Sequence, residues 1–109
     1  MDIQSLRNMI ASDRDSALLR LTLARLLLQK GAVEDAEEAE QHLQNAVQMD
    51  AAYTAAWKEL GKAKRLSGDA SGAADAWSKG IECARENGDI QAEKEMNVFL
   101  RRLSRDSKL

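Results

Sequence analysis

An internal repeat of apolar and small residues restricts the fold of this chain more than any other feature. Leu23-Ala24 and Gly31 lie 37 residues before Leu60-Gly61 and Gly68. The second halves of the two units match at an offset of 34 residues, with Ala39, Leu43, Ala46 and Val47 preceding Ala73, Trp77, Gly80 and Ile81. A period near 34 residues with two helices in each unit is typical of helical solenoids.

The apolar spacing within each unit predicts helices. Apolar side chains recur at three- and four-residue steps, and glycine follows the periodic stretches at Gly31, Gly68 and Gly88, where left-handed C-terminal caps are expected. Proline is absent from the 109 residues, which favours long helices with short turns. We therefore predict a single domain over 1–109, with an N-terminal helix (1–12), a first repeat (16–50), a second repeat (52–87) and a C-terminal capping helix (89–106).

The second unit carries a recognisable motif. Trp57-x-x-Leu60-Gly61, followed by Gly68, Ala73 and Trp77, resembles the tetratricopeptide repeat pattern. Small residues at positions 61, 73 and 80 would let the paired helices approach closely, and Trp57 and Trp77 would fill the space between successive helices. The unit departs from the family pattern at Lys64, where a tyrosine is usual, and in lacking the closing proline.

The resemblance covers about Ser16 to Asn87 and extends to short stand-alone bacterial members of the family. It implies an all-α fold, a short right-handed solenoid of two helix hairpins with flanking N- and C-terminal helices. It also implies that the chain binds another protein. In such arrays the first helix of each hairpin lines the concave surface.

Charge alternates between the helices of each hairpin. Residues 32–50 contain six acidic residues and no Lys or Arg, whereas residues 51–66 have a net charge of +3. If the chain follows the family, its concave surface is therefore basic. The predicted groove residues are Leu21, Arg25, Leu28, Lys58, Lys62 and Arg65. Basic groups beside apolar ones suit an acidic or amphipathic peptide of a partner protein. The alternative is that these are ordinary solvated charges that pair within helices, as Glu59 and Lys62 would.

Catalytic, cofactor and metal sites are not predicted. The chain has one histidine, His42, and one cysteine, Cys83, and neither has the neighbours that metal binding or acid–base chemistry requires. We expect His42 to be a surface or half-buried helix residue and Cys83 to be a packed or partly exposed inert thiol, and we expect no enzyme. A net charge of −2 gives no general attraction to nucleic acid or membrane, and a single cysteine fits a reducing cytoplasm.

A second functional hypothesis is self-association. Two complete repeats are fewer than a solenoid usually needs, so the end helices would act either as caps or as an interface. In the second case Leu6, Ile10, Phe99 and Leu103 would form the contacts of a homodimer or of a subunit in a larger assembly.

Overall fold

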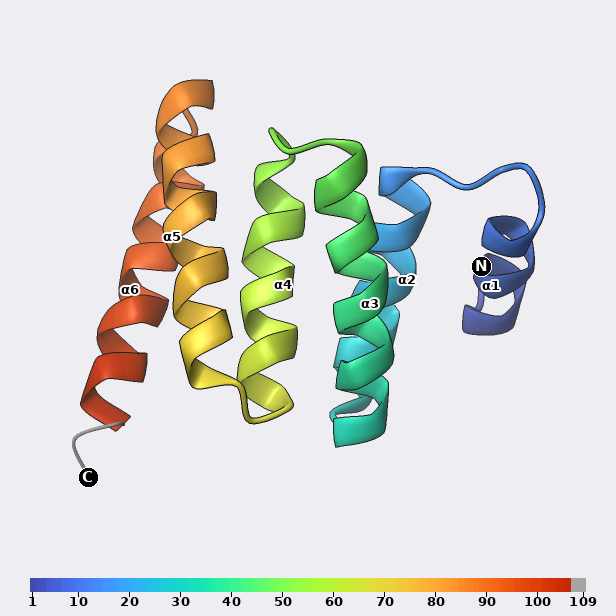
Figure 1. Cartoon of the computed structure of the whole chain (residues 1–109), viewed down its shortest axis with the longest axis horizontal. Coiled ribbons are helices and arrows are strands. Elements are labelled where there is room, and N and C mark those ends of the chain that lie inside the picture. The colour runs from blue at the N-terminus through green and yellow to red at the C-terminus, as the bar shows by residue number, and fades with distance from the viewer. Residues whose placement is uncertain (107–109) are drawn as a thin grey trace.

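A computed structural model describes residues 1–106 as six α-helices joined by short turns (Figure 1). The helices are α1 (Ile3–Ala11), α2 (Ala17–Lys30), α3 (Val33–Met49), α4 (Thr54–Leu66), α5 (Ala70–Asn87) and α6 (Ile90–Asp106). They form a row with α1 at one end and α5 and α6 at the other. Residues 1–106 contain no strand, and the stacked hairpins α2–α3 and α4–α5 form the short helical solenoid that the repeat predicts.

Local side-chain chemistry sets the helix ends. The Ser16 hydroxyl accepts a hydrogen bond from the Leu19 amide at 3.1 Å at the start of α2, and the Asp69 carboxylate accepts one from the Gly72 amide at 2.8 Å at the start of α5. Gly31 ends α2 at a φ of 79°, a left-handed conformation that glycine adopts without steric cost. The left-handed cap at Gly31 is the one expected from the sequence, because capping depends on neighbours in the sequence.

The turn between the two hairpins forms without a proline. Asp50 ends α3 in an extended conformation, and its carboxylate accepts a hydrogen bond from the Ala52 amide at 3.0 Å. This local turn takes over the chain-breaking role of the missing proline.

Two glycines within helices allow close packing. A Cβ on Gly61 in α4 would lie 2.5 Å from Cδ1 of Trp77 in α5, and a Cβ on Gly80 would lie 2.5 Å from the sulfur of Met96 in α6. Both distances are shorter than the contacts that a Cβ atom makes with non-bonded atoms, so a larger residue at position 61 would displace the rigid indole of Trp77, and one at position 80 would displace the end of the Met96 side chain. The prediction that small residues bring the paired helices together is confirmed at Gly61, whereas Gly80 makes room first for α6 and also lies close to α4, where a Cβ would stand 3.0 Å from Cβ of Trp57.

The two tryptophans, predicted to play equivalent roles, differ in their surroundings. Trp77 is 2% exposed and donates a hydrogen bond from Nε1 to the carbonyl of Lys58 at 3.0 Å. Trp57 is only half-buried; its Nε1 donates to the Ala51 carbonyl at 2.8 Å, and the ammonium of Lys79 lies 5.4 Å from its ring centroid. Trp77 therefore fills the layer between helices, whereas one side of Trp57 reaches the surface.

The end helices complete the core. Leu6 of α1 is fully buried with the apolar residues of α2, α3 and α4. Met96 of α6 is fully buried in a second cluster around Trp77, and Phe99 packs against the same cluster. Leu6 is therefore buried within the fold and is not exposed at the surface. The last helix, α6, also forms one wall of a surface hollow.

Candidate functional site

A hollow of about 570 Å³ opens where the first helices of the hairpins meet α6. It is lined by Leu28 of α2, by Lys62, Arg65 and Leu66 of α4, by Trp77 of α5, and by Phe99 and Arg102 of α6. Apolar side chains and cationic side chains therefore share one concave surface.

The floor of the hollow is aromatic. The rings of Trp77 and Phe99 lie 5.2 Å apart between centroids at an interplanar angle of 44°. The ammonium of Lys62 lies 5.5 Å from the Phe99 centroid, a distance that permits a cation–π interaction. Lys62 is thereby held at the edge of the hollow, with its charge beside an apolar surface.

Three of the six predicted groove residues, Leu28, Lys62 and Arg65, line this hollow. Arg65 is more than half exposed, and its Nη2 lies 3.5 Å from a carboxylate oxygen of Asp106, which is equally exposed. Because both side chains reach water, this ion pair is weak and Arg65 can exchange Asp106 for another anion.

The other three predicted residues lie elsewhere. Leu21 is 2% exposed within the core, which corrects its assignment to the surface: the 37-residue offset matched it to Lys58, but the neighbouring helices cover this side of α2. Lys58 is 18% exposed in its side chain, and its ammonium donates to Glu95 of α6 at 3.3 Å. Lys58 therefore ties α4 to α6, and Arg25 lies outside the hollow lining as well.

An acidic residue sits between two of the predicted cations. Glu59 is 7% exposed, and one carboxylate oxygen lies 3.7 Å from Nε of Arg25 and 3.6 Å from Nζ of Lys62. The pairing of Glu59 with Lys62 follows from their three-residue spacing, but the contact with Arg25 on another helix does not. Glu59 partly neutralises the concave surface, which is less basic than the residue count predicts.

Sequence reasoning missed Leu66, Trp77, Phe99 and Arg102 as lining residues, and it assigned Trp77 to the space between helices. The helical spacing assigned Phe99 to the apolar side of the last helix, and the basic character of residues 90–109 includes Arg102. The rotation of α6 about its axis, which decides which of its side chains face the hollow, could not be predicted from the sequence. Among the ion pairs of residues 1–106 none involves Arg102, so its charge is available at the rim.

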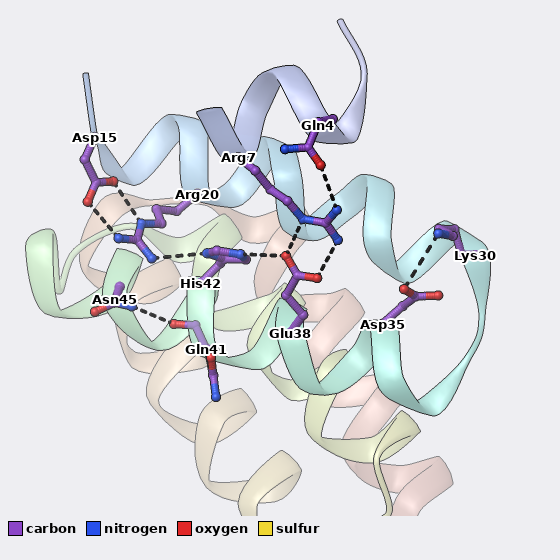
Figure 2. Close-up of polar contacts among 10 residues, drawn as sticks. All are labelled: Gln4, Arg7, Asp15, Arg20, Lys30, Asp35, Glu38, Gln41, His42 and Asn45. Carbon is purple, nitrogen blue, oxygen red and sulfur yellow. Dashed lines mark hydrogen bonds and ion pairs between the residues drawn. The ribbon is translucent and has the colours of Figure 1, made fainter. Parts of the chain in front are cut away.

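A second polar cluster joins α1, α2 and α3 around His42 (Figure 2). Arg7 donates from Nε to Oε2 of Glu38 at 2.9 Å and from Nη2 to Oε1 at 2.6 Å. His42 lies between Glu38 and Arg20, with Nε2 3.2 Å from Glu38 Oε2 and Nδ1 3.1 Å from Arg20 Nη1. Arg20 in turn donates twice to Asp15.

This cluster holds the helices together. A guanidinium can only donate, so Nδ1 of His42 accepts from Arg20 and the ring proton lies on Nε2, facing Glu38. The Arg7 guanidinium holds the pKa of Glu38 below its ordinary value, and Arg20 does the same for the pKa of Asp15. His42 is half-buried, within the predicted range; its partner Glu38 lies one helical turn before it in α3, whereas Arg20 comes from α2.

Cys83 is a partly buried thiol. Its Sγ donates to the Ala51 carbonyl at 3.1 Å, and burial, with Glu86 and Glu82 nearby, raises the pKa of the thiol. A raised pKa lowers the thiolate fraction and hence the reactivity. Within residues 1–106 no group of three His, Cys, Asp or Glu side chains has the geometry to hold a metal ion, and no helix has the length and apolar character needed to cross a membrane.

Comparison with known proteins gives extensive matches to a curated protein and to solved structures. No protein-family model matches the chain. The chain is 50% identical over 105 residues to the TPR repeat-containing protein PA0015 of Pseudomonas aeruginosa, covering 96% of this chain and 97% of that protein. It also matches the solution structure of protein BPP2914 from Bordetella parapertussis, with a TM-score of 0.81 and 39% identity, covering 97% of this chain and 90% of that one.

Proposed function

This chain belongs to the tetratricopeptide repeat family, whose members are in general protein-interaction modules, and we propose that it binds an acidic, amphipathic peptide segment of a partner protein in the hollow between α2, α4 and α6. The observation that carries the proposal is the combination of an apolar floor and a cationic rim in one concave surface. The floor is formed by Leu28, Leu66 and the paired rings of Trp77 and Phe99.

The chemistry of the hollow selects the peptide. A leucine-like side chain placed on the aromatic floor removes apolar surface from water, and neighbouring carboxylates meet Lys62, Arg65 and Arg102. A neutral apolar peptide would gain no charge pairing with these cations, and a basic peptide would be repelled by them. Recognition therefore requires both an apolar anchor and acidic flanks.

The test is capture of partners from the source cells by the tagged protein, followed by mapping of the bound segment on the captured partner. The variant Lys62→Glu/Arg65→Glu/Arg102→Glu reverses the rim. Each exposed charge contact contributes about 0.2–1 kcal/mol, so we expect at least about tenfold weaker binding of the mapped segment. The segment should contain carboxylates on both sides of an apolar residue.

The matched control is Arg14→Glu/Lys30→Glu/Lys79→Glu, which changes the net charge equally at positions outside the hollow lining. It should bind the segment nearly as well as the wild type. Equal binding by the rim variant and the wild type would eliminate this hollow as the site. Capture of a second copy of this chain, instead of a different protein, would favour the self-association hypothesis.

A further inference from the structure

The charges of α6 are sorted between its two sides. Its three acidic residues all face earlier helices: Glu93 pairs with Arg85 at 2.8 Å, Glu95 with Lys58 at 3.3 Å and Asp106 with Arg65 at 3.5 Å. None of the ion pairs within residues 1–106 involves the exposed cations of α6, which are Lys94, Arg101, Arg102 and Arg105. As far as residues 1–106 show, the outer side of the helix therefore carries positive charge that no ion pair neutralises, while Arg102 lies at the rim of the hollow of the proposed function.

Three of these cations share one stripe with apolar residues. Ile90, Lys94, Val98, Arg101 and Arg105 follow one another at steps of three or four, so they lie on one face of the helix. Lys94 and Arg105 are 11 residues apart, about 16 Å along the axis. Ile90 is 65% exposed, and Val98 lines a hollow of about 460 Å³ together with Arg101 and Arg105.

The position of α6 in the row explains why this face is open. In the solenoid, successive helices stack against one another, and α6 packs on α4 and α5. It is the last helix of the part that the structure describes, and no further helix of residues 1–106 covers its outer side (Figure 1). The place that the next helix of the row would take is thus bordered by cations and by Ile90 and Val98.

We propose that the outer face of α6 is a docking surface for an acidic amphipathic helix of a partner protein, which stacks on α6 as the next helix of the row. Carboxylates at three- and four-residue steps complement Lys94, Arg101 and Arg105, and apolar side chains between them cover Ile90 and Val98. The apolar positions within the stripe distinguish this partner from a nucleic acid, because phosphates gain nothing from them and no aromatic residue lies in the stripe to stack on bases. This stripe adjoins the hollow of the proposed function at Arg102, which lines both hollows, but Lys94, Val98, Arg101 and Arg105 do not line that first hollow.

The probe is a synthetic, end-blocked helical peptide of roughly 18 residues, about five turns, with glutamates and leucines spaced to match the stripe. Amide chemical shifts of the full chain are followed during the titration. We expect the perturbed amides to centre on residues 90–105 of α6. The triple variant Lys94→Glu/Arg101→Glu/Arg105→Glu should bind the peptide at least about tenfold more weakly, because three contacts become repulsive.

Two controls make the outcome specific. The charge-conserving variant Lys94→Arg/Arg101→Lys/Arg105→Lys should retain binding, and so should Lys62→Glu/Arg65→Glu, which alters the hollow instead. The three reversed residues have no ion-pair partner within residues 1–106, so the triple variant should keep its fold. If it unfolds, the neutral variant Lys94→Gln/Arg101→Gln/Arg105→Gln takes its place in the binding experiment. The proposal is overturned if the peptide does not bind, if its shifts map to the hollow, or if single-stranded RNA binds α6 more tightly than the peptide does.

Discussion

Gly61 and Trp77 lie so close together that a single methyl group on the glycine would overlap the indole ring. The Cβ of an alanine at position 61 would stand 2.5 Å from Cδ1 and Cε2 of Trp77 and nearer still to Nε1. The same Nε1 donates to the Lys58 carbonyl at 3.0 Å, so the ring cannot withdraw without losing a buried hydrogen bond. This contact fixes how α4 and α5 pair, and through Phe99 it fixes the floor of the hollow.

Gly61→Ala is expected to destabilise the protein by about 1–3 kcal/mol, the usual cost of overpacking a filled interior, despite the better helix propensity of alanine. The measurement is the free energy of unfolding in urea. Ser78→Ala, at an exposed position of α5, is the control and should change that free energy by no more than about 0.5 kcal/mol. A Gly61→Ala variant as stable as the wild type would contradict the close contact.

Trp77→Ala is expected to lower the free energy of unfolding by about 3–5 kcal/mol, because a fully buried ring leaves a large cavity. Against a typical total of about 5–15 kcal/mol, this loss would unfold a substantial fraction of the protein. Trp77→Phe keeps a ring but removes the hydrogen bond to Lys58, and should cost distinctly less. Chemical denaturation of the three proteins in parallel measures the difference; equal stability of all three would refute the assigned role of Trp77.

Stability should decline in acid through the cluster around His42. The pKa of Glu38 lies below its ordinary value of 4.5 because Arg7 donates to it, and that of Asp15 lies below 3.8 because of Arg20. A carboxyl whose pKa is lower in the folded state adds stability above its unfolded pKa and loses it as the pH falls through the folded value. The free energy of unfolding is therefore expected to fall as the pH drops below about 4.5.

Glu38→Gln isolates this contribution. The variant should be less stable than the wild type near neutral pH, and the difference should shrink as the pH falls and wild-type Glu38 becomes protonated. Thermal melting across the acidic range measures it. Glu37→Gln, at an exposed neighbouring position with no ion pair among residues 1–106, should show no such convergence.

Glu59→Gln is expected to strengthen binding of an acidic peptide in the hollow by about threefold, because it removes the carboxylate that Arg25 and Lys62 share. This expectation rests on the proposed function and is measured by calorimetric titration of the mapped partner segment at low salt. Glu86→Gln on α5 makes the same change in net charge at an exposed position away from the hollow and should leave the affinity unaltered. Weaker binding by Glu59→Gln would mean that the concave surface does not attract acids.

The sequence by itself determined the helices, their ends and their pairing. Capping residues such as Ser16 and Asp69 bind backbone amides within three residues of themselves. Gly61 and Gly80 lie where a large side chain of another helix packs directly against the backbone. Such signals are local, so they can be read before any fold is known. The repeat of about 34 residues then fixed the order in which the helices stack.

Only the tertiary structure decided which side chains face the concave surface. A helical face spans a wide arc, so a spacing argument placed Leu21 on the same surface as Leu28, although one is buried and the other lines the hollow. The structure also decided which charges are already paired: Lys58 meets Glu95 across 37 residues, and Glu59 meets Arg25 across two helices. These contacts depend on the rotation of each helix about its axis, which is set by the packing of the entire row and not by any single stretch of sequence.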